Sequence, residues 1–251
     1  MTFSSVAHIL TRSLCHLPPS EFLQGVSDGT GGEVEYEEFW RVSLIPELIK
    51  AACSITGAWG GATASGDLIQ LRALDWSTDG PFQQWPLLAT FHPDDGSFAY
   101  STLGFVGLYG TLTGWSSSGM AVSEKFWAEY DKLDNIYGQT SAQPGSIEAA
   151  VPKSSTHTLC SPFASPSGYP WPWLLQDVLR YDSDVDEAMS RVATAVRTCA
   201  MWFGFGQAAR ANPRNPQGEN LPANFKLLQY SFEKVSFFNP ENCEKMREKT
   251  L

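Results

Sequence analysis

Residues 51–76 read AACSITGAWGGATASGDLIQLRALDW, and this stretch carries the clearest structural pattern in the chain. Two apolar and β-branched runs, CSITGAW and LIQLRALDW, flank GGATASGD, whose glycines and aspartate are typical of a turn. The pattern predicts a β-hairpin. Antiparallel pairing would bring Cys53, at the start of the first strand, close to Arg72 and Asp75 on the second.

Outward from this hairpin, the strand–turn–strand pattern occurs twice more. PLLATFHP and SFAYSTLGF flank an Asp-Asp-Gly turn, and YGTLTGW and MAVSEKF flank SSSG. Three consecutive hairpins predict an antiparallel sheet. Near the C-terminal end, CAMWFGF, FKLLQYS and KVSFFN predict three more strands.

Helices are predicted on both sides of the second and third hairpins. Residues 35–52 have helical spacing of apolar residues, with a break at Pro46. Residues 171–181 and 185–197 also have helical spacing, and Asp184 with Glu187 resembles a capping box at the second of these starts. Strands, helices and strands again predict an α+β layered fold in which helices cover the sheet.

Composition and charge exclude several classes of protein. Of the 251 residues, 43% are hydrophobic and 18% are charged, which indicates one large globular domain or two small ones. The net charge of −10 repels the phosphates of nucleic acids and anionic lipid headgroups. No apolar run approaches the roughly 18 residues of a membrane helix. We therefore expect no nucleic-acid partner and no integral membrane segment.

The sequence also predicts no metal site and no cofactor. The five cysteines form no C-x-x-C motif, and the four histidines form no H-x-x-x-H motif. Gly204, Gly206 and Ala209 match the dinucleotide pattern G-x-G-x-x-A. The helix that this pattern requires is interrupted at Asn212 and Pro213, so we expect no dinucleotide site.

Cys53 is the candidate nucleophile. A thiol attacks as its thiolate, and a nearby guanidinium such as that of Arg72 favours this form. If the bond between Ala52 and Cys53 were cut, the new α-amino group would be a suitable base at neutral pH. A buried structural cysteine is the alternative interpretation, with Arg72 and Asp75 as an ordinary ion pair. Arg72 and Asp75 are three positions apart on one strand, so their side chains face opposite ways unless the strand twists or bulges between them.

Residues 51–76 resemble the nucleophile hairpin of the cysteine-type N-terminal nucleophile hydrolases. The similarity is to acid ceramidase-like proteins and to the related acylethanolamine amidases and isopenicillin N acyltransferases. Cys53 matches the first residue of the mature chain in these proteins, and Arg72 to Asp75 match their R-x-x-D motif. GLYGTLTGWSSSGMAVSEKFW resembles their G-x-x-T-G hairpin, with Glu124 in the acidic position. Ser123 and Lys125 replace an Asn and an Arg there. The resemblance covers most of residues 44–133 and 169–243.

The resemblance implies a four-layer αββα sandwich of the N-terminal nucleophile hydrolase type. It implies residues 1–52 as an N-terminal segment, a propeptide or α-subunit part, and residues 53–251 as the hydrolase-like domain. A flexible insertion is expected at residues 137–168, where Ser, Thr, Ala, Pro and Gly dominate.

The implied activity is that of a cysteine amidase that hydrolyses a non-peptide linear amide, the N-acyl bond of a lipid-like or other small molecule. Autocatalytic cleavage before Cys53 would expose the nucleophile and its amine. The resemblance assigns Asp75 to orient that amine and Arg72 to stabilise the thiolate or the substrate carbonyl region. It assigns Glu124 to the proton network.

Two alternatives stay open at this point. The family's oxyanion Asn lies in a strand beyond the segment matched by FFNPEN, and the sequence stops at Leu251, so a truncated or catalytically inactive homologue with a binding or structural role is the first alternative. An acyltransferase is the second. Related proteins are lysosomal or secreted, but residues 1–17 lack the apolar region of a signal peptide. The sequence assigns no location, oligomeric state or disulfide pairing.

Overall fold

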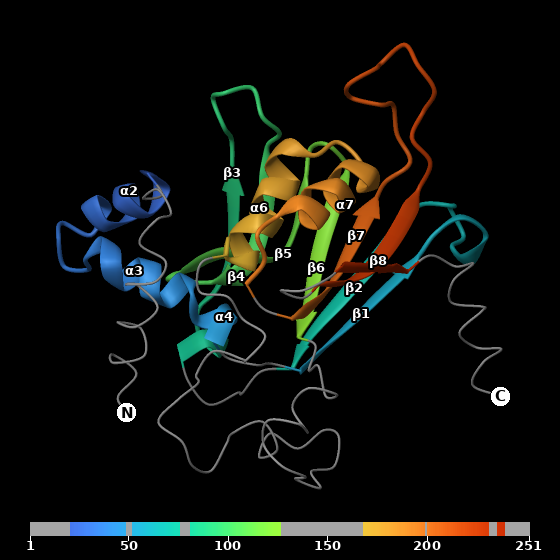
Figure 1. Cartoon of the computed structure of the whole chain (residues 1–251). Helices are drawn as coiled ribbons and strands as arrows, with labels where there is room; N and C mark the ends of the chain where they lie inside the picture. The colour runs from blue at the N-terminus through green and yellow to red at the C-terminus, as the bar shows by residue number, and fades with distance from the viewer. Residues whose placement is uncertain are drawn as a thin grey trace, which may run out of the picture.

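The protein combines helices with two antiparallel sheets (Figure 1). A computed structural model describes residues 21–48, 52–75, 81–126, 168–198, 200–230 and 235–238. The expected flexible insertion at 137–168 therefore lies almost entirely outside the described residues, as do both ends of the chain.

The hairpin predicted from residues 51–76 is confirmed. Strands β1 (Ala52–Ala58) and β2 (Ile69–Asp75) pair antiparallel and form a two-stranded sheet of their own. Their register is regular from end to end, and it pairs Cys53 with Leu74 and Ile55 with Arg72. A short 3-10 helix, η1 (Gly60–Ala62), lies in the connection between them.

The remaining strands form one seven-stranded antiparallel sheet in which neighbours follow chain order. This confirms the expected antiparallel pairing, although the first hairpin stands apart from the other two. A second 3-10 helix, η2 (Pro81–Gln83), precedes the sheet. The strands are β3 (Pro86–Phe91), β4 (Tyr100–Phe105), β5 (Leu108–Ser116), β6 (Met120–Phe126), β7 (Met201–Gln207), β8 (Asn224–Tyr230) and β9 (Val235–Phe238).

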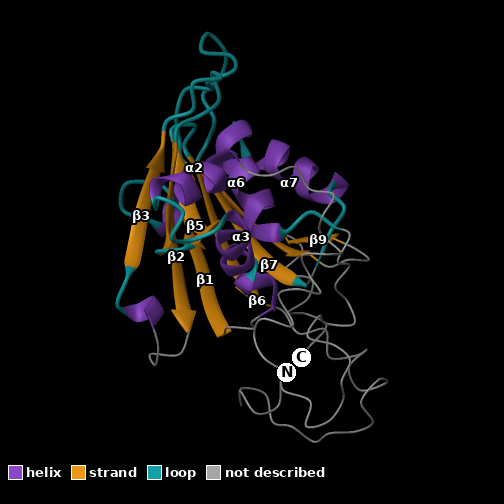
Figure 2. Ribbon diagram, turned by 90° about the vertical axis from the view of Figure 1, so that its left-hand side faces the viewer, coloured by secondary structure: helices purple, strands orange, loops and turns teal. Residues whose placement is uncertain are grey.

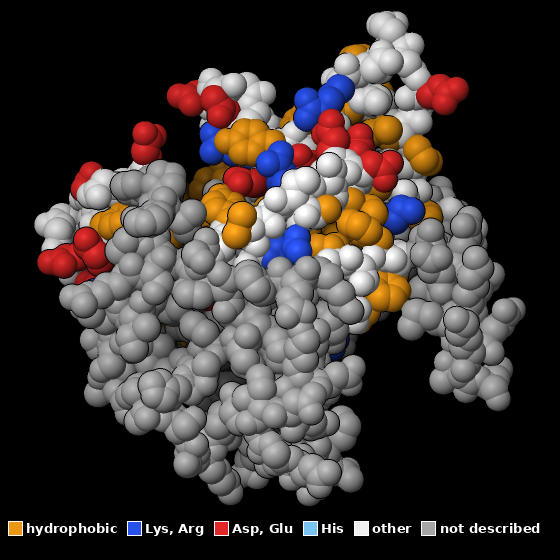
Figure 3. Space-filling model, in the orientation of Figure 1, with side chains coloured by type: hydrophobic (Ala, Val, Ile, Leu, Met, Phe, Trp, Pro, Cys, Tyr) orange, Lys and Arg blue, Asp and Glu red, His pale blue; other side chains and the backbone are white. Residues whose placement is uncertain are grey.

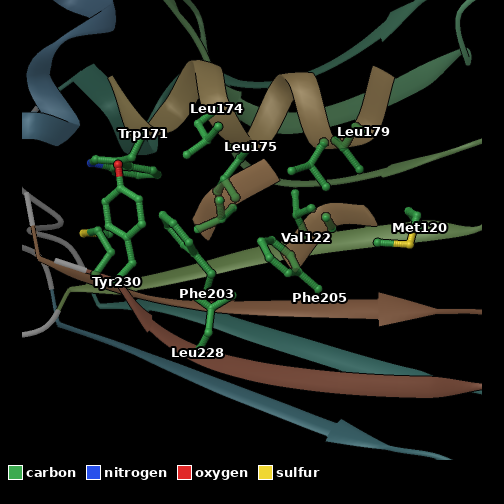
Figure 4. Close-up of a cluster of buried hydrophobic side chains, with 14 of the residues drawn as sticks. Met120, Val122, Trp171, Leu174, Leu175, Leu179, Phe203, Phe205, Leu228 and Tyr230 are labelled. Carbon is green, nitrogen blue, oxygen red and sulfur yellow. The ribbon is translucent and has the colours of Figure 1, made fainter. Parts of the chain in front are cut away.

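Two helices, α6 (Trp171–Tyr181) and α7 (Val185–Thr194), lie side by side over one face of the large sheet (Figures 1 and 2). Gly114 of β5 lets α6 approach closely, because a Cβ at that position would come within 2.6 Å of a Leu179 methyl carbon. Burying each large apolar side chain here stabilises the fold by about 1.5–3 kcal/mol. Figure 4 shows the core between helices and sheet, formed by Met120, Val122, Trp171, Leu174, Leu175, Leu179, Phe203, Phe205, Leu228 and Tyr230.

The start of α7 was predicted closely, whereas its end was not. The Asp184 side chain accepts hydrogen bonds from the backbone N–H groups of Asp186 and Glu187, as an N-cap does. The Glu187 carboxylate accepts the backbone N–H of Ser183 at 2.7 Å, so the reciprocal half of the box reaches one residue further back. The helix ends at Thr194 instead of continuing to residue 197.

The two-stranded sheet packs on the other face of the large sheet. Gly204 and Gly206, inside β7, lie under the hairpin, and a Cβ on Gly204 would come within 2.9 Å of an Ile55 methyl carbon. A Cβ on Gly206 would collide with the Gln70 side chain. These glycines therefore allow close contact between the two sheets, which accounts for the G-x-G pattern without a nucleotide-binding turn.

The described residues thus form three layers: helices, large sheet and hairpin. On the outer face of the hairpin, Ile69 and Leu71 are 61% and 57% exposed, so no described helix covers their side chains. The antiparallel α+β organisation agrees with the prediction. The complete four-layer αββα sandwich stays a prediction.

Residues 21–48 form three short helices, α2 (Glu21–Gly29), α3 (Tyr36–Ser43) and α4 (Ile45–Leu48). The expected break is present, since α3 ends at Ser43 and Pro46 lies in the first turn of α4. The Glu47 carboxylate accepts the backbone N–H of Trp171, at the start of α6, at 2.6 Å. This part of the chain is therefore tied to the helical layer.

Charged side chains are interspersed on the helical face (Figure 3). Within the described ranges, no helix has both the length and the apolar character needed to cross a membrane. The ion pairs on this face join Arg180 to Asp95 at 2.6 Å, Arg191 to Asp182 at 2.6 Å, and Arg214 to Glu187 at 2.8 Å.

Candidate functional site

Strand alternation places Cys53 on the inner face of the hairpin. Residues paired across β1 and β2 share a face, so Cys53 faces the large sheet together with Leu74, and Ile55 faces it with Arg72. Cys53 is only 3% exposed. Its thiol therefore lies in the layer between the two sheets.

The Arg72 guanidinium joins this thiol to a carboxylate. One terminal nitrogen, Nη2, lies 3.5 Å from Cys53 Sγ and also forms an ion pair with Oε1 of Glu124, on β6. The side chains of Arg72 and Glu124 are 7% and 6% exposed. The structure thus brings together three of the four residues predicted for the site, drawn from three strands.

Burial dominates the electrostatics of this group. It raises the pKa of the Cys53 thiol above its ordinary value, and the Glu124 carboxylate adds to the increase. The Arg72 guanidinium opposes both effects by favouring the thiolate. Burial also raises the pKa of Glu124, again against the influence of Arg72. In this arrangement the neutral thiol is favoured, and the arginine is the group that makes its ionisation less costly.

Asp75 is the fourth predicted residue, and its carboxylate is not part of this group. The regular register leaves no bulge between Arg72 and Asp75, so the two side chains face opposite ways and Asp75 is exposed. Its backbone, however, hydrogen-bonds Cys53 in a way that lowers the pKa of the thiol. Asp75 is also paired directly with Ala52, and it therefore lies beside the peptide bond that precedes Cys53.

A polar contact next to the site was not predicted from the sequence. The amide nitrogen of Gln70, on β2, donates to Ser123 Oγ at 2.7 Å and to the Gly204 carbonyl at 3.1 Å. Ser123 is completely buried. Only the positions of these residues could have indicated the contact. Gln70 precedes Arg72 by two residues and so shares its face of the strand, and Ser123 immediately precedes Glu124.

The arrangement has the components of thiol chemistry. It contains a sulfur atom, a guanidinium that stabilises its negative charge, and a carboxylate that holds the guanidinium in place. Among the described residues, no three His, Cys, Asp or Glu side chains are grouped as a metal ion would require.

Comparison with known proteins finds two curated relatives and a distant structural likeness. No protein-family model matches the chain. Protein dcd1A of Dictyostelium discoideum is 32% identical over 229 residues, which are 88% of this chain and 42% of that protein. Protein dcd1B of the same organism is 33% identical over 222 residues, which are 87% of this chain and 35% of that protein. The chain thus spans less than half the length of the curated relatives it matches.

A match to a solved structure has low sequence identity. That structure is the Caenorhabditis elegans ortholog of an N-acylethanolamine-hydrolyzing acid amidase, with a TM-score of 0.44 and 15% sequence identity. The match covers 76% of this chain and 66% of the other.

Proposed function

We propose that the protein is a cysteine amidase that hydrolyses the N-acyl bond of a small or lipid-like molecule after cleavage of its own chain before Cys53. The observation that carries the proposal is the contact between Cys53 Sγ and Arg72 Nη2 at 3.5 Å, with Arg72 held by Glu124. A neutral thiol with a purely structural role is stabilised little by a nearby cation, whereas a thiolate is stabilised strongly. The contact with Arg72 therefore favours a reactive cysteine over a structural one.

The first step is an attack on the chain itself. Cys53 Sγ forms a bond to the carbonyl carbon of Ala52, the C–N bond to the Cys53 nitrogen breaks, and that nitrogen takes up the thiol proton. Water then hydrolyses the thioester, which leaves a carboxylate on Ala52 and restores the thiol. The new amino group emerges beside Asp75, since Asp75 is paired with Ala52, and we assign this carboxylate to orient the amine.

The second reaction uses the same atoms on a substrate. The amine accepts the thiol proton, the thiolate attacks the amide carbonyl, and the leaving amine departs with that proton. Water activated by the same amine then hydrolyses the acyl-enzyme. Arg72 stabilises the thiolate, and Glu124 keeps the guanidinium in place and joins the proton network.

Mass spectrometry of the expressed protein tests the first step. The proposal expects a fragment beginning at Cys53 in the wild type and an intact chain in Cys53→Ala. Ser54→Ala is the matched control, because Ser54 is the neighbouring residue but lies on the exposed face of β1. The proposal is wrong if Cys53→Ala is cleaved at the same bond, or if the wild type remains intact through prolonged incubation across acidic and neutral pH.

Turnover tests the second step. N-acyl amines with acyl chains of increasing length serve as substrates, and amine release is measured for the wild type and Cys53→Ala. We expect release only from the wild type. Equal release from both proteins would exclude Cys53 as the nucleophile.

The burial of the thiol also supports a second function. Cys53 is 3% exposed and its pKa is raised, properties that suit a catalytically inactive protein with a binding or structural role. An intact wild-type chain without amidase activity is the result that this second function expects.

A further inference from the structure

Gln70 joins the two sheets at one point. Its amide nitrogen donates to Ser123 Oγ on β6 at 2.7 Å and to the Gly204 carbonyl on β7 at 3.1 Å. One side chain of the hairpin is therefore bonded to two neighbouring strands of the large sheet. Ser123 is completely buried, so no solvent competes for this contact.

Among the described residues, strand pairing does not fix the relative position of the two sheets. The hairpin and the seven-stranded sheet share no strand pairing in the described residues. At the contact, Gly204 of β7 lies against Ile55 of β1, Gly206 of β7 lies against Gln70 of β2, and Gly57 of β1 lies against the Phe225 ring of β8. Apolar packing is not directional, so it resists sliding along the strands weakly. A hydrogen bond with defined geometry resists it more strongly.

The Gln70 contact lies beside the Arg72 ion pair. Gln70 and Arg72 are two residues apart on one face of β2, while their partners Ser123 and Glu124 are adjacent on β6. A slip of the hairpin by one residue would move Arg72 by about 3.4 Å along the strand. Cys53 is on the same hairpin and would move with Arg72, whereas Glu124 would stay in place, so the guanidinium could no longer hold both partners. The ion pair with Glu124 is the stronger of the two contacts, so the contact with Cys53 is the one that would be lost.

We propose that Gln70 and Ser123 form a positioning pair that fixes the hairpin against β6 and so holds Arg72 between Glu124 and Cys53. The pair does not touch the reacting atoms. Its effect on turnover rests on the proposed amidase function, whereas its effect on the thiol does not.

The test compares three variants with the wild type. Gln70→Met keeps the length of the side chain and removes its amide, and Ser123→Ala removes one buried oxygen. Leu71→Met is the matched control, because Leu71 lies between Gln70 and Arg72 but is 57% exposed on the outer face. The readout is the titration of Cys53, followed by the ¹³Cβ chemical shift of the resonance that disappears in Cys53→Ser.

We expect the titration midpoint of Cys53 to rise by about half a pH unit or more in Gln70→Met and in Ser123→Ala, since Arg72 favours the thiolate. At pH 8 this corresponds to an about threefold loss of thiolate, and the self-cleavage rate should fall in proportion. The double variant should shift the midpoint no further than the larger single change, because both single changes remove the hydrogen bond between Gln70 and Ser123. Leu71→Met should leave the midpoint unchanged.

An unchanged midpoint in both Gln70→Met and Ser123→Ala would overturn the proposal, even if both variants unfold more easily. If Gln70→Met does not fold, Ser123→Ala decides the question alone. Because the titration needs no turnover, a wild type that neither cleaves itself nor hydrolyses amides would refute the proposed amidase and leave this test in force.

Discussion

The ion pair between Arg72 and Glu124 is expensive to bury, and its position explains why it is present. Both side chains are less than 8% exposed, and removing such charges from water costs several kcal/mol per ion. A pair of apolar residues would fill the same space at lower cost. The arginine is in contact with the thiol of the only cysteine among the described residues, which is the arrangement that thiolate chemistry requires.

Arg72→Met should therefore destabilise the fold strongly, by about 3–5 kcal/mol at pH 7, since it leaves Glu124 buried without its partner. The loss should shrink in acid. Burial raises the pKa of Glu124 in the folded protein above its pKa in the unfolded chain. The contribution of Glu124 to the free energy of unfolding is therefore fully present below the unfolded-state pKa, and it is lost as the pH rises through the folded-state pKa. Urea unfolding at a series of pH values from 4 to 8 measures both effects.

The control is the double variant Arg72→Met with Glu124→Gln, which has no buried charge at either position. Its stability should depend on pH much less than that of Arg72→Met. A cost of Arg72→Met that is the same at pH 4.5 and pH 8 would show that the loss comes from packing instead of charge.

The site residues were predictable to different degrees. The closeness of Cys53 and Arg72 follows from the hairpin, because the two residues are diagonal neighbours on one face of the paired strands. Their assignment as site residues came from the family resemblance. Glu124 was identified by resemblance. Strand alternation would turn it away from its neighbour Ser123, yet both side chains bond to the hairpin. Gln70 was missed because a glutamine in a strand has no pattern that distinguishes a solvated amide from one bonded across two sheets.

Hairpins were recognisable as elements, but their assignment to sheets was not. Turn residues and alternating runs predict which strands pair locally, and β1 with β2, β3 with β4, and β5 with β6 all pair so. Nothing local specifies whether one hairpin extends the next or stacks on it. The glycines of β7 indicate that the hairpin stacks on the sheet, but this can be recognised only when the residues that pack on them are known.

Gly57→Ala should test the stacking of the hairpin on the large sheet. A Cβ on Gly57 would collide with the ring of Phe225, on β8, with its Cδ2 atom at 2.7 Å. A packed ring cannot easily move, so we expect a cost of about 1–3 kcal/mol, although alanine is otherwise less flexible than glycine in the unfolded chain. Chemical denaturation measures the cost.

Gly61→Ala is the matched change on the same hairpin, because a Cβ at Gly61 would meet nothing within 4 Å. It should be nearly neutral. Equal stability of the two variants would mean that the hairpin tolerates displacement from β8.

Helix α2 (Glu21–Gly29) was not predicted from the sequence, although its apolar residues have helical spacing. Its apolar residues Phe22, Leu23 and Val26 have helical spacing, but the helix has only nine residues and contains Gly25 and Gly29, which are poor helix formers. Leu23 is completely buried, so tertiary packing stabilises a segment whose own propensity is low.

The large sheet is covered unevenly on its hairpin side. Register places Gly204, Ser123, Thr113, Leu103 and Leu88 in one line across β7, β6, β5, β4 and β3, all on the same face. The hairpin covers the Gly204 and Ser123 end of this line. At the other end, Leu103 and Leu88 are 48% and 56% exposed.

This uncovered end is apolar over several strands. Trp115 is two residues from Thr113 on β5 and therefore lies on the same face, where it is 47% exposed. Trp85 and Val106, next to β3 and β4, are 61% and 56% exposed and are joined by a backbone hydrogen bond from Val106 to Trp85. Apolar surface of this kind is uncommon on a monomeric protein.

An exposed apolar face on a chain of net charge −10 makes its colloidal behaviour depend on ionic strength. At low salt, like charge keeps the molecules apart. At 0.5 M NaCl that repulsion is screened within a few ångströms, so attraction between the uncovered leucines should turn the second virial coefficient from positive to negative. Light scattering measures this change, which Leu88→Lys should suppress and which Thr56→Lys, on the outer face of β1, should leave in place. A second virial coefficient that stays positive at high salt would mean that this face does not cause attraction between protein molecules.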